Sequence, residues 1–286
     1  MKAYQAEHTI TRMARVLRVS RAGYYAWLGR APSVRAQSDA LLLAEIRAIH
    51  LASRGTYGVR RVHASLQQQG WRVGKNRVAR CMAEAGIVGV TRRRSKTTTV
   101  RNPRQRPAPD LVERQFRATR PDALWVADIT HIPTVTGAVY LAAVQDVWSR
   151  RIVGWAVDSH MESELAQRAL TAAVARRKPI DVIHHSDQGS QYTARAFKQL
   201  AERHGVRLSM GTVADCYDNA MAESFFATLE CELQALHRFH NLEDAHRALF
   251  DFIEGFYNTH RLHSGVGYRS PVDFERASRH EMAAAK

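Results

Sequence analysis

The chain has 286 residues, of which 45% are hydrophobic, and carries a formal net charge of +15. This length suffices for two or three modules with a sizeable core. No apolar run approaches a membrane span and the start lacks the apolar segment of a secretory signal, so we expect a cytoplasmic, nucleoid-associated protein with no membrane partner. Three widely spaced cysteines without a CxxC pair argue against a disulfide framework and a zinc cluster.

The positive charge lies in the first part of the chain. Residues 1–121 carry 25 Lys and Arg against 6 Asp and Glu, whereas residues 122–286 carry 17 against 21. This excess is larger than a solvated basic surface requires, and it indicates a region that binds phosphates. This division fits a protein in which the basic residues 1–121 hold a polyanion and the mildly acidic residues 122–286 cut it.

Residues 1–31 predict a helix-turn-helix-like unit. Two short helices are separated near Val19, and Ser20 can cap the second helix, which is the candidate for reading a DNA groove. A helical hairpin within a larger bundle is the alternative. The predicted DNA contacts of this unit are Arg21, Tyr24 and Tyr25.

Residues 32–90 predict a second helical DNA-binding unit. One helix is capped at Ser38 or Asp39, a second covers residues 59–69, and a third begins near Asn76. We interpret these three helices as a second helix-turn-helix, with basic side chains that either contact phosphates or are solvated helix charges. The predicted phosphate contacts are Arg60, Arg61, Lys75, Arg77 and Arg80.

Residues 91–121 predict a basic linker, because apolar residues become rare and Arg alternates with Thr, Pro and Asn. We expect an extended segment that becomes ordered on DNA or serves as a solubilising tether. Its predicted DNA contacts are Arg92, Arg93 and Arg94.

From residue 122 the pattern changes to three strands in an antiparallel meander, followed by alternating helices and strands. This order predicts a ribonuclease-H-like α/β core with C-terminal helices and a basic tail over residues 122–286. The expected strands cover residues 124–132, 139–147, 152–157, 182–185 and 206–210. The expected helices cover residues 162–177 and 194–204, a segment capped by Asp218 or Asn219 with Leu236 on its apolar face, residues 242–257, and a short segment from Pro271.

Three acidic residues stand out in this core. Asp128 interrupts a buried strand, where an unpaired charge is costly, Asp187 follows an apolar strand, and Glu223 lies in the first turns of a helix. Such carboxylates can converge, but they repel one another unless a cation lies between them, and Mg²⁺ prefers oxygen ligands. We therefore predict that all three are catalytic residues and metal ligands. For the nearby His131, His184 and His185 a hydrogen-bonded packing role is favoured over metal ligation.

The spacing of the acids, with 58 and then 35 intervening residues, resembles the Asp-Asp-35-Glu core of retroviral-type integrases. With residues 185–192 and 218–226 around it, the core is more narrowly similar to the second reading frame of bacterial insertion-sequence transposases. Further family-like motifs make the resemblance cover nearly the whole chain: residues 19–27, 57–61, 257–264 and 267–271. Residues 210–215 depart from the family, which tends to carry a Ser-basic-x-Gly pattern at this place.

The resemblance implies a DNA transposase that nicks element ends with water and joins the freed 3′-OH to target DNA at the same site. Two Mg²⁺ ions, replaceable by Mn²⁺, would serve this chemistry, with Asp128 shared and Asp187 and Glu223 each holding one ion. The expected partners are double-stranded DNA at the terminal repeats and the target, a second copy in a homo-oligomer, and an upstream-frame partner or fusion. Asn258, Arg261 and His263 are either DNA contacts or part of a helix C-cap.

Two other functions compete with this one. A structure-specific metal-dependent nuclease of the same fold would not need two helix-turn-helix-like units. A non-catalytic helix-turn-helix DNA-binding regulator with a decayed core would not need all three acids. The sequence therefore favours the transposase.

Overall fold

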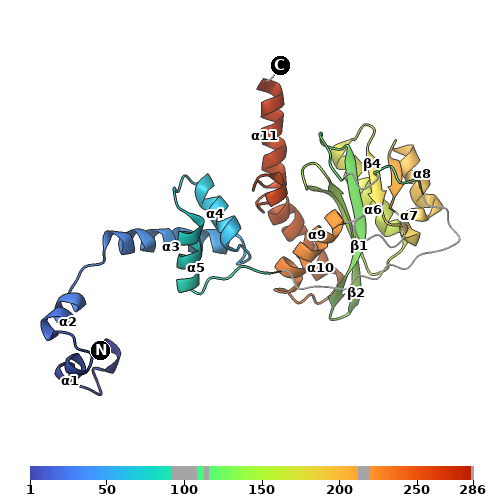
Figure 1. Ribbon diagram of the computed structural model, residues 1–286. Coiled ribbons are helices and arrows are strands. Elements are labelled where there is room, and N and C mark those ends of the chain that lie inside the picture. The colour runs from blue at the N-terminus through green and yellow to red at the C-terminus, as the bar shows by residue number, and fades with distance from the viewer. Residues whose placement is uncertain (92–107, 113–115, 212–219, 285–286) are drawn as a thin grey trace.

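The computed structural model describes residues 1–91, 108–112, 116–211 and 220–284 (Figure 1). Within these residues five strands form one mixed sheet in the order β3-β2-β1-β4-β5. Strands β1 to β3 form the predicted antiparallel meander, and β1, β4 and β5 run parallel. The strands are β1 (Leu124–Thr134), β2 (Gly137–Asp146), β3 (Ile152–Asp158), β4 (Ile183–Ser186) and β5 (Arg207–Met210).

Alternating side chains of β1 give the sheet two covered faces. Trp125 and Ala127 pack in a cluster with α6 and α8, whereas Leu124 and Val126 pack with Met221 and neighbouring residues of α9. Figure 1 shows α6 to α8 on one side of the sheet and α9 and α10 on the other. The helices are α6 (Ser163–Arg177), α7 (Ser190–Thr193), α8 (Arg195–Arg203), α9 (Ala220–Leu229) and α10 (Leu242–Phe250). The ribonuclease-H-like fold class is thereby confirmed, although the short α7 was not predicted.

The contact between β3 and α6 depends on Gly154. A Cβ atom built on Gly154 would lie 2.3 Å from the carbonyl oxygen of Ala169 and 2.5 Å from the backbone nitrogen of Ala173. We expect Gly154→Ala to lower the free energy of unfolding by roughly 1–3 kcal/mol, because the helix must move away from the sheet. Gly29→Ala is the control, since its Cβ would meet nothing closer than 3.5 Å. Denaturant melts of both variants test the prediction, and equal midpoints would contradict it.

The basic part of the chain is helical, as predicted. Ser20 Oγ accepts the backbone N–H of Gly23 and caps α2, and α1 and α2 lie apart from the sheet in Figure 1. The predicted cap at Ser38 or Asp39 was wrong: α3 is capped by Ser33, so Ser38 and Asp39 lie inside it and accept hydrogen bonds from Arg77 instead. These helices are α1 (Ile10–Val16), α2 (Arg21–Leu28), α3 (Val34–Ala52), α4 (Val59–Gln68) and α5 (Lys75–Glu84), preceded by the 3₁₀ turn η1 (Lys2–Tyr4).

Two of the C-terminal helices change their winding. Helix α9 continues directly into the π-helix η2 (Glu230–Gln234), and α10 continues into the π-helix η3 (Asp251–Tyr257). Leu236, predicted to be buried with Phe225 and Leu229, is 60% exposed because the helix ends at Gln234, two residues before it. The predicted caps Asp218 and Asn219 lie outside the described residues.

The last helix, α11 (Pro271–Ala284), follows the 3₁₀ turn η4 (Ser264–Val266) and is longer than the short helix predicted. Buried Glu275 anchors it to the core by ion pairs with Arg151 at 2.8 Å and Arg177 at 3.0 Å. Figure 1 shows the rest of α11 projecting away from the sheet. No described helix combines the length and apolar composition that a membrane span requires.

Candidate active site

The register between β1 and β4 determines where the first two acids lie. Trp125 pairs with His184 and Val126 with His185, and Asp128 and Asp187 each lie two residues beyond this last parallel pair. In-register neighbours on parallel strands point to the same face of the sheet. Asp187 follows the last residue of β4, as predicted, and its charge acts on Asp128, so the two acids lie near each other just past the end of the paired segment.

Helix α9 brings the third acid to this face. Asp128 has the same strand parity as Val126, which packs against Met221 and Ala222 of α9. Glu223 follows directly in the first turn of α9 and is half-buried. The sheet and α9 thus carry all three acids to one side of the molecule.

The three carboxylates interact electrostatically. The pKa of Asp128 is raised from 3.8 to about 7 by burial, by the charge of Asp187 and, more weakly, by the charge of Glu223. The backbone N–H of Ile129, which donates to Asp128 Oδ1 at 2.7 Å, acts in the opposite direction and lowers it. Burial also raises the pKa of Asp187, although the N–H of Gly189 donates to its Oδ1 at 3.0 Å. Each aspartate thus has one oxygen held by the backbone.

The donor set of the three acids fits a hard divalent cation. It consists of carboxylate oxygens, which Mg²⁺ and Mn²⁺ prefer, and their mutual repulsion is the kind that such a cation offsets. Within the described residues, no three His, Cys, Asp or Glu side chains are close enough together to hold a metal ion as they stand. Like charges favour separation when no cation lies between them, and a bound cation would offset that repulsion.

Models of known families match successive parts of the chain. An HTH-like domain matches residues 36–95, and two integrase core domain models match residues 118–216 and 204–271, which together contain the three acids. The chain is 41% identical to the insertion element IS600 uncharacterized 31 kDa protein of Shigella sonnei, covering 95% of this chain and 100% of the relative. It is 36% identical to transposase InsF for insertion sequence IS3A of Escherichia coli, covering 96% of each chain.

The chain belongs to the insertion-sequence transposases with an integrase core domain. A third relative, the transposase for insertion sequence element IS629 of Shigella sonnei, is 39% identical over 86% of this chain and 82% of the relative. The predicted family and DNA transposase function are confirmed, and the chain is a DNA-acting enzyme. The nuclease and the non-catalytic regulator are therefore set aside.

Sequence reasoning missed the surroundings of the acids in the transposase. Tyr192 on α7 is buried, its hydroxyl has no hydrogen-bond partner within the described residues, and burial with the charges of Asp128 and Asp187 raises its pKa well above the usual value. A Cβ on Gly189 would lie 2.9 Å from Asp187 Oδ1, so this glycine allows the carboxylate to approach the backbone. The only signal in the sequence was the polar run that follows β4 and extends into α7, from Asp187 to Gln191.

The histidines near the acids differ in their roles. His184 packs against Tyr192 and Phe197, and burial lowers its pKa to about 4, so its ring is neutral. A packing role was predicted, but neither ring nitrogen has a hydrogen-bond partner in the part of the chain that the structure describes. His185 does have one, since its Nδ1 lies 2.9 Å from Ser209 Oγ, whereas His131 is exposed.

Several predicted DNA contacts of the transposase are buried, which corrects the prediction for Tyr24, Asn258, Arg261 and His263. Tyr24 packs against Trp27 and is hydrogen-bonded by Gln5, and the other three are at most 8% exposed. Such side chains cannot reach a phosphate without unfolding part of the protein. Asn258 is the C-cap residue of η3, in line with the alternative role.

The other predicted contacts fall into three groups. Arg61 and Arg77 are half-buried and form ion pairs with Glu232 and Asp39, and Arg80 also pairs with Asp39. Arg92, Arg93 and Arg94 lie outside the described residues. The exposed candidates are Arg21, Tyr25, Arg60 and Lys75.

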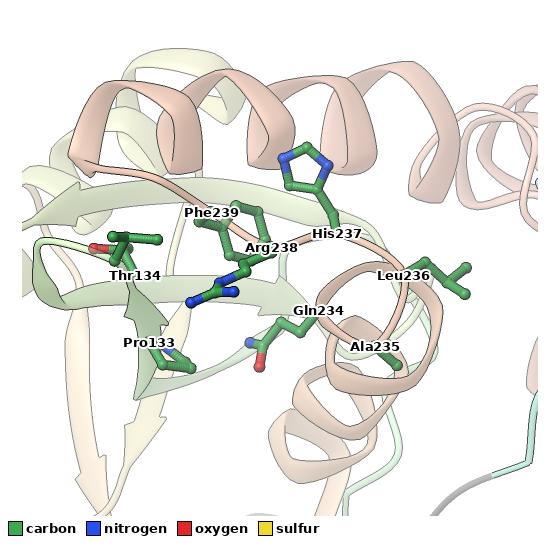
Figure 2. Close-up of a pocket in the computed structure, with 9 residues that line it drawn as sticks. Pro133, Thr134, Gln234, Ala235, Leu236, His237, Arg238 and Phe239 are labelled. Atoms are coloured by element: carbon green, nitrogen blue, oxygen red, sulfur yellow. The ribbon is translucent and has the colours of Figure 1, made fainter.

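A surface pocket of about 500 Å³ lies away from the acids (Figure 2). Its walls are the tip of the β1–β2 hairpin at Pro133 and Thr134 and the segment 234–239. The two walls are joined by a hydrogen bond from the N–H of Val135 to the carbonyl of Phe239. Pro133 is five residues beyond Asp128 in β1, a distance of about 17 Å along a strand, so the pocket is separate from the acids.

Proposed function

We propose that Asp128, Asp187 and Glu223 are the catalytic residues with which the transposase nicks DNA at the ends of its element and joins the freed 3′ ends to target DNA. The observation that carries this proposal is the arrangement of the three acids: Asp128 and Asp187 lie just beyond the last β1–β4 pair, and α9, which packs against Val126, carries Glu223. The raised pKa of Asp128, caused by burial and by the charges of the other two acids, supports it. Placing three carboxylates near one another costs folding free energy, because like charges repel and burial disfavours charge. Such a cluster therefore indicates a functional role rather than a structural one.

The carboxylates are proposed to hold two Mg²⁺ ions, with Asp128 shared and Asp187 and Glu223 each holding one. Bound there, the ions would supply activation of the attacking oxygen and charge stabilisation at the phosphorus and at the leaving 3′ oxygen. The backbone N–H groups of Ile129 and Gly189 each hold one oxygen of an aspartate, which orients the second oxygen. Mn²⁺ is expected to replace Mg²⁺ because it accepts the same oxygen ligands.

The helical units at residues 1–31 and 32–90 and the linker at residues 91–121 are proposed to bind the terminal repeats. Their cationic side chains suit phosphates, and the acids of the core would repel DNA without them. We further propose a homo-oligomer on DNA, because two ends each need a site, and an upstream-frame partner or fusion. The proposed contacts on these segments are Arg21, Tyr25, Arg60, Lys75, Arg92, Arg93 and Arg94.

Asp187→Ala tests the catalytic assignment. We expect the nicking rate of a labelled duplex that carries the terminal repeat to fall roughly 10³-fold or more in Mg²⁺. Binding to the same duplex in Ca²⁺ should stay within twofold of the wild type. Asp181→Ala is the matched control, because Asp181 is 60% exposed and forms a surface pair with Arg207. An Asp187→Ala protein that nicks as fast as the wild type would refute the assignment.

A further inference from the structure

Most of the motif of residues 257–264 is buried among elements that are far apart in sequence; its buried residues are Tyr257, Asn258, Arg261, Leu262 and His263. Asn258 binds both backbone groups of Ile152 in β3: its Oδ1 accepts the N–H at 2.9 Å and its Nδ2 donates to the carbonyl at 3.0 Å. Tyr257 contacts β2 through a hydrogen bond between its hydroxyl and Gln145 Nε2 at 2.9 Å. The motif is thus fixed to the sheet at its start.

Arg261 connects this motif to the helix that carries Glu223. Its guanidinium binds Glu232 of η2 through two hydrogen bonds of 2.7 Å, one to each carboxylate oxygen, and lies 3.4 Å from Thr228 Oγ1 of α9. Arg261 and Glu232 are 4% and 6% exposed. Burial and the neighbouring Arg261 lower the pKa of His263 well below its usual value, so His263 is neutral and accepts from Arg261 at 3.3 Å.

The helix-turn-helix-like unit of α3 to α5 joins the same network from the other side. Arg61 of α4 donates to Glu232 Oε1 at 3.2 Å and to the carbonyl of Leu262 at 3.1 Å. The Tyr57 hydroxyl accepts the N–H of Leu262 at 2.6 Å. Two guanidinium groups therefore share one buried carboxylate, and the hydrophobic cluster around them includes residues of α4 and of α9.

We propose that the Arg61–Glu232–Arg261 network couples docking of the α3–α5 unit to the position of the Glu223 carboxylate. Glu223, Thr228 and Glu232 lie on one uninterrupted helical segment, so a force applied at Glu232 is transmitted along the helix to Glu223. The winding changes from α-helix to π-helix between Thr228 and Glu232, and π-helical turns are frequent at functional sites. Arg61, Glu232 and Arg261 act as positioning residues in this proposal, which rests on the proposed catalytic role of Glu223.

Arg61→Met tests the coupling, because it removes the contribution of α4 and leaves Glu232 paired with Arg261. We expect the Mg²⁺ concentration for half-maximal nicking to rise about five- to a hundredfold, with terminal-repeat binding in Ca²⁺ unchanged within twofold. Arg61→Lys, which keeps the charge but loses the planar fork, should give an intermediate value. The control is Arg247→Met, which breaks an ion pair with Glu243 that is 75% and 83% exposed.

Nicking rates are compared at the same number of degrees below each variant's melting midpoint. The variants then contain the same fraction of folded protein, so a difference in rate does not come from unfolding. An unchanged Mg²⁺ dependence in both Arg61 variants would overturn the proposal. Weaker DNA binding at an unchanged Mg²⁺ dependence would also overturn it, and would make Arg61 a DNA contact instead. These outcomes for the Arg61 variants are separate from the Asp187→Ala test. Full activity of Asp187→Ala would refute the catalytic assignment, whereas the Arg61 outcomes would refute only the coupling.

Discussion

Replacing Asp128 with Asn should abolish nicking and, at the same time, stabilise the metal-free transposase against unfolding at neutral pH. The variant keeps the shape of the side chain but removes a buried charge that Asp187 and Glu223 repel. We expect a loss of roughly 10³-fold or more in nicking rate, since an amide is a far poorer ligand for Mg²⁺ than a carboxylate.

The pH dependence of stability distinguishes this explanation from a general effect of the substitution. The folded-state pKa of Asp128 is about 7, above the ordinary value of 3.8, so the folded protein holds this proton more tightly. Its contribution to stability is therefore complete below about pH 4 and is lost as the pH rises through 7. At pH 8 in EDTA the variant should exceed the wild type by about 2–4 kcal/mol, given 1.36 kcal/mol per pKa unit.

Thermal melts from pH 4 to pH 8 in EDTA, with and without added Mg²⁺, measure both effects. The advantage of Asp128→Asn should grow with pH up to about 7, and added Mg²⁺ should raise the melting temperature of the wild type more than that of the variant. Parallel melting curves for the two proteins across this pH range would contradict the electrostatic account.

Glu232→Gln should be among the most destabilising single substitutions in the chain. The neutral amide would leave Arg261, which is 4% exposed, without its counter-charge, and Arg61 would add to the repulsion. Removing one partner of a buried ion pair costs about 3–5 kcal/mol, whereas breaking the exposed Arg247–Glu243 pair should cost about 0–1 kcal/mol. Urea denaturation of Glu232→Gln and Arg247→Met compares the two directly.

A triple variant shows whether the loss comes from unpaired charge. Replacing Arg61, Glu232 and Arg261 together with Met removes every charge of the network and keeps similar apolar volume. Its stability should recover most of the loss seen in Glu232→Gln, because buried ion networks contribute little net stability over well-packed apolar groups. A triple variant as unstable as Glu232→Gln would mean that hydrogen-bond geometry, not charge, holds the network together.

Much of the core could be predicted because its signals are local. The apolar runs that became β1 to β3, the Ser20 cap and the acid inside a buried strand depend only on residues close together in the chain. The spacing of Asp128, Asp187 and Glu223 carried the family resemblance in the same way. The start of α3 was predicted wrongly because several nearby residues can cap a helix. Ser33 caps it, whereas Ser38 or Asp39 had been predicted.

The partners of the charged residues could not be predicted, since they lie far along the chain. An arginine has the same sequence signature whether it binds a phosphate or a buried acid, and Glu232 lies 171 residues from Arg61 and 29 from Arg261. The sequence by itself therefore determined the strands, the acids and the family. Only the tertiary structure decided that Asn258, Arg261 and His263 face inward, because burial and pairing depend on which distant segments the fold brings together.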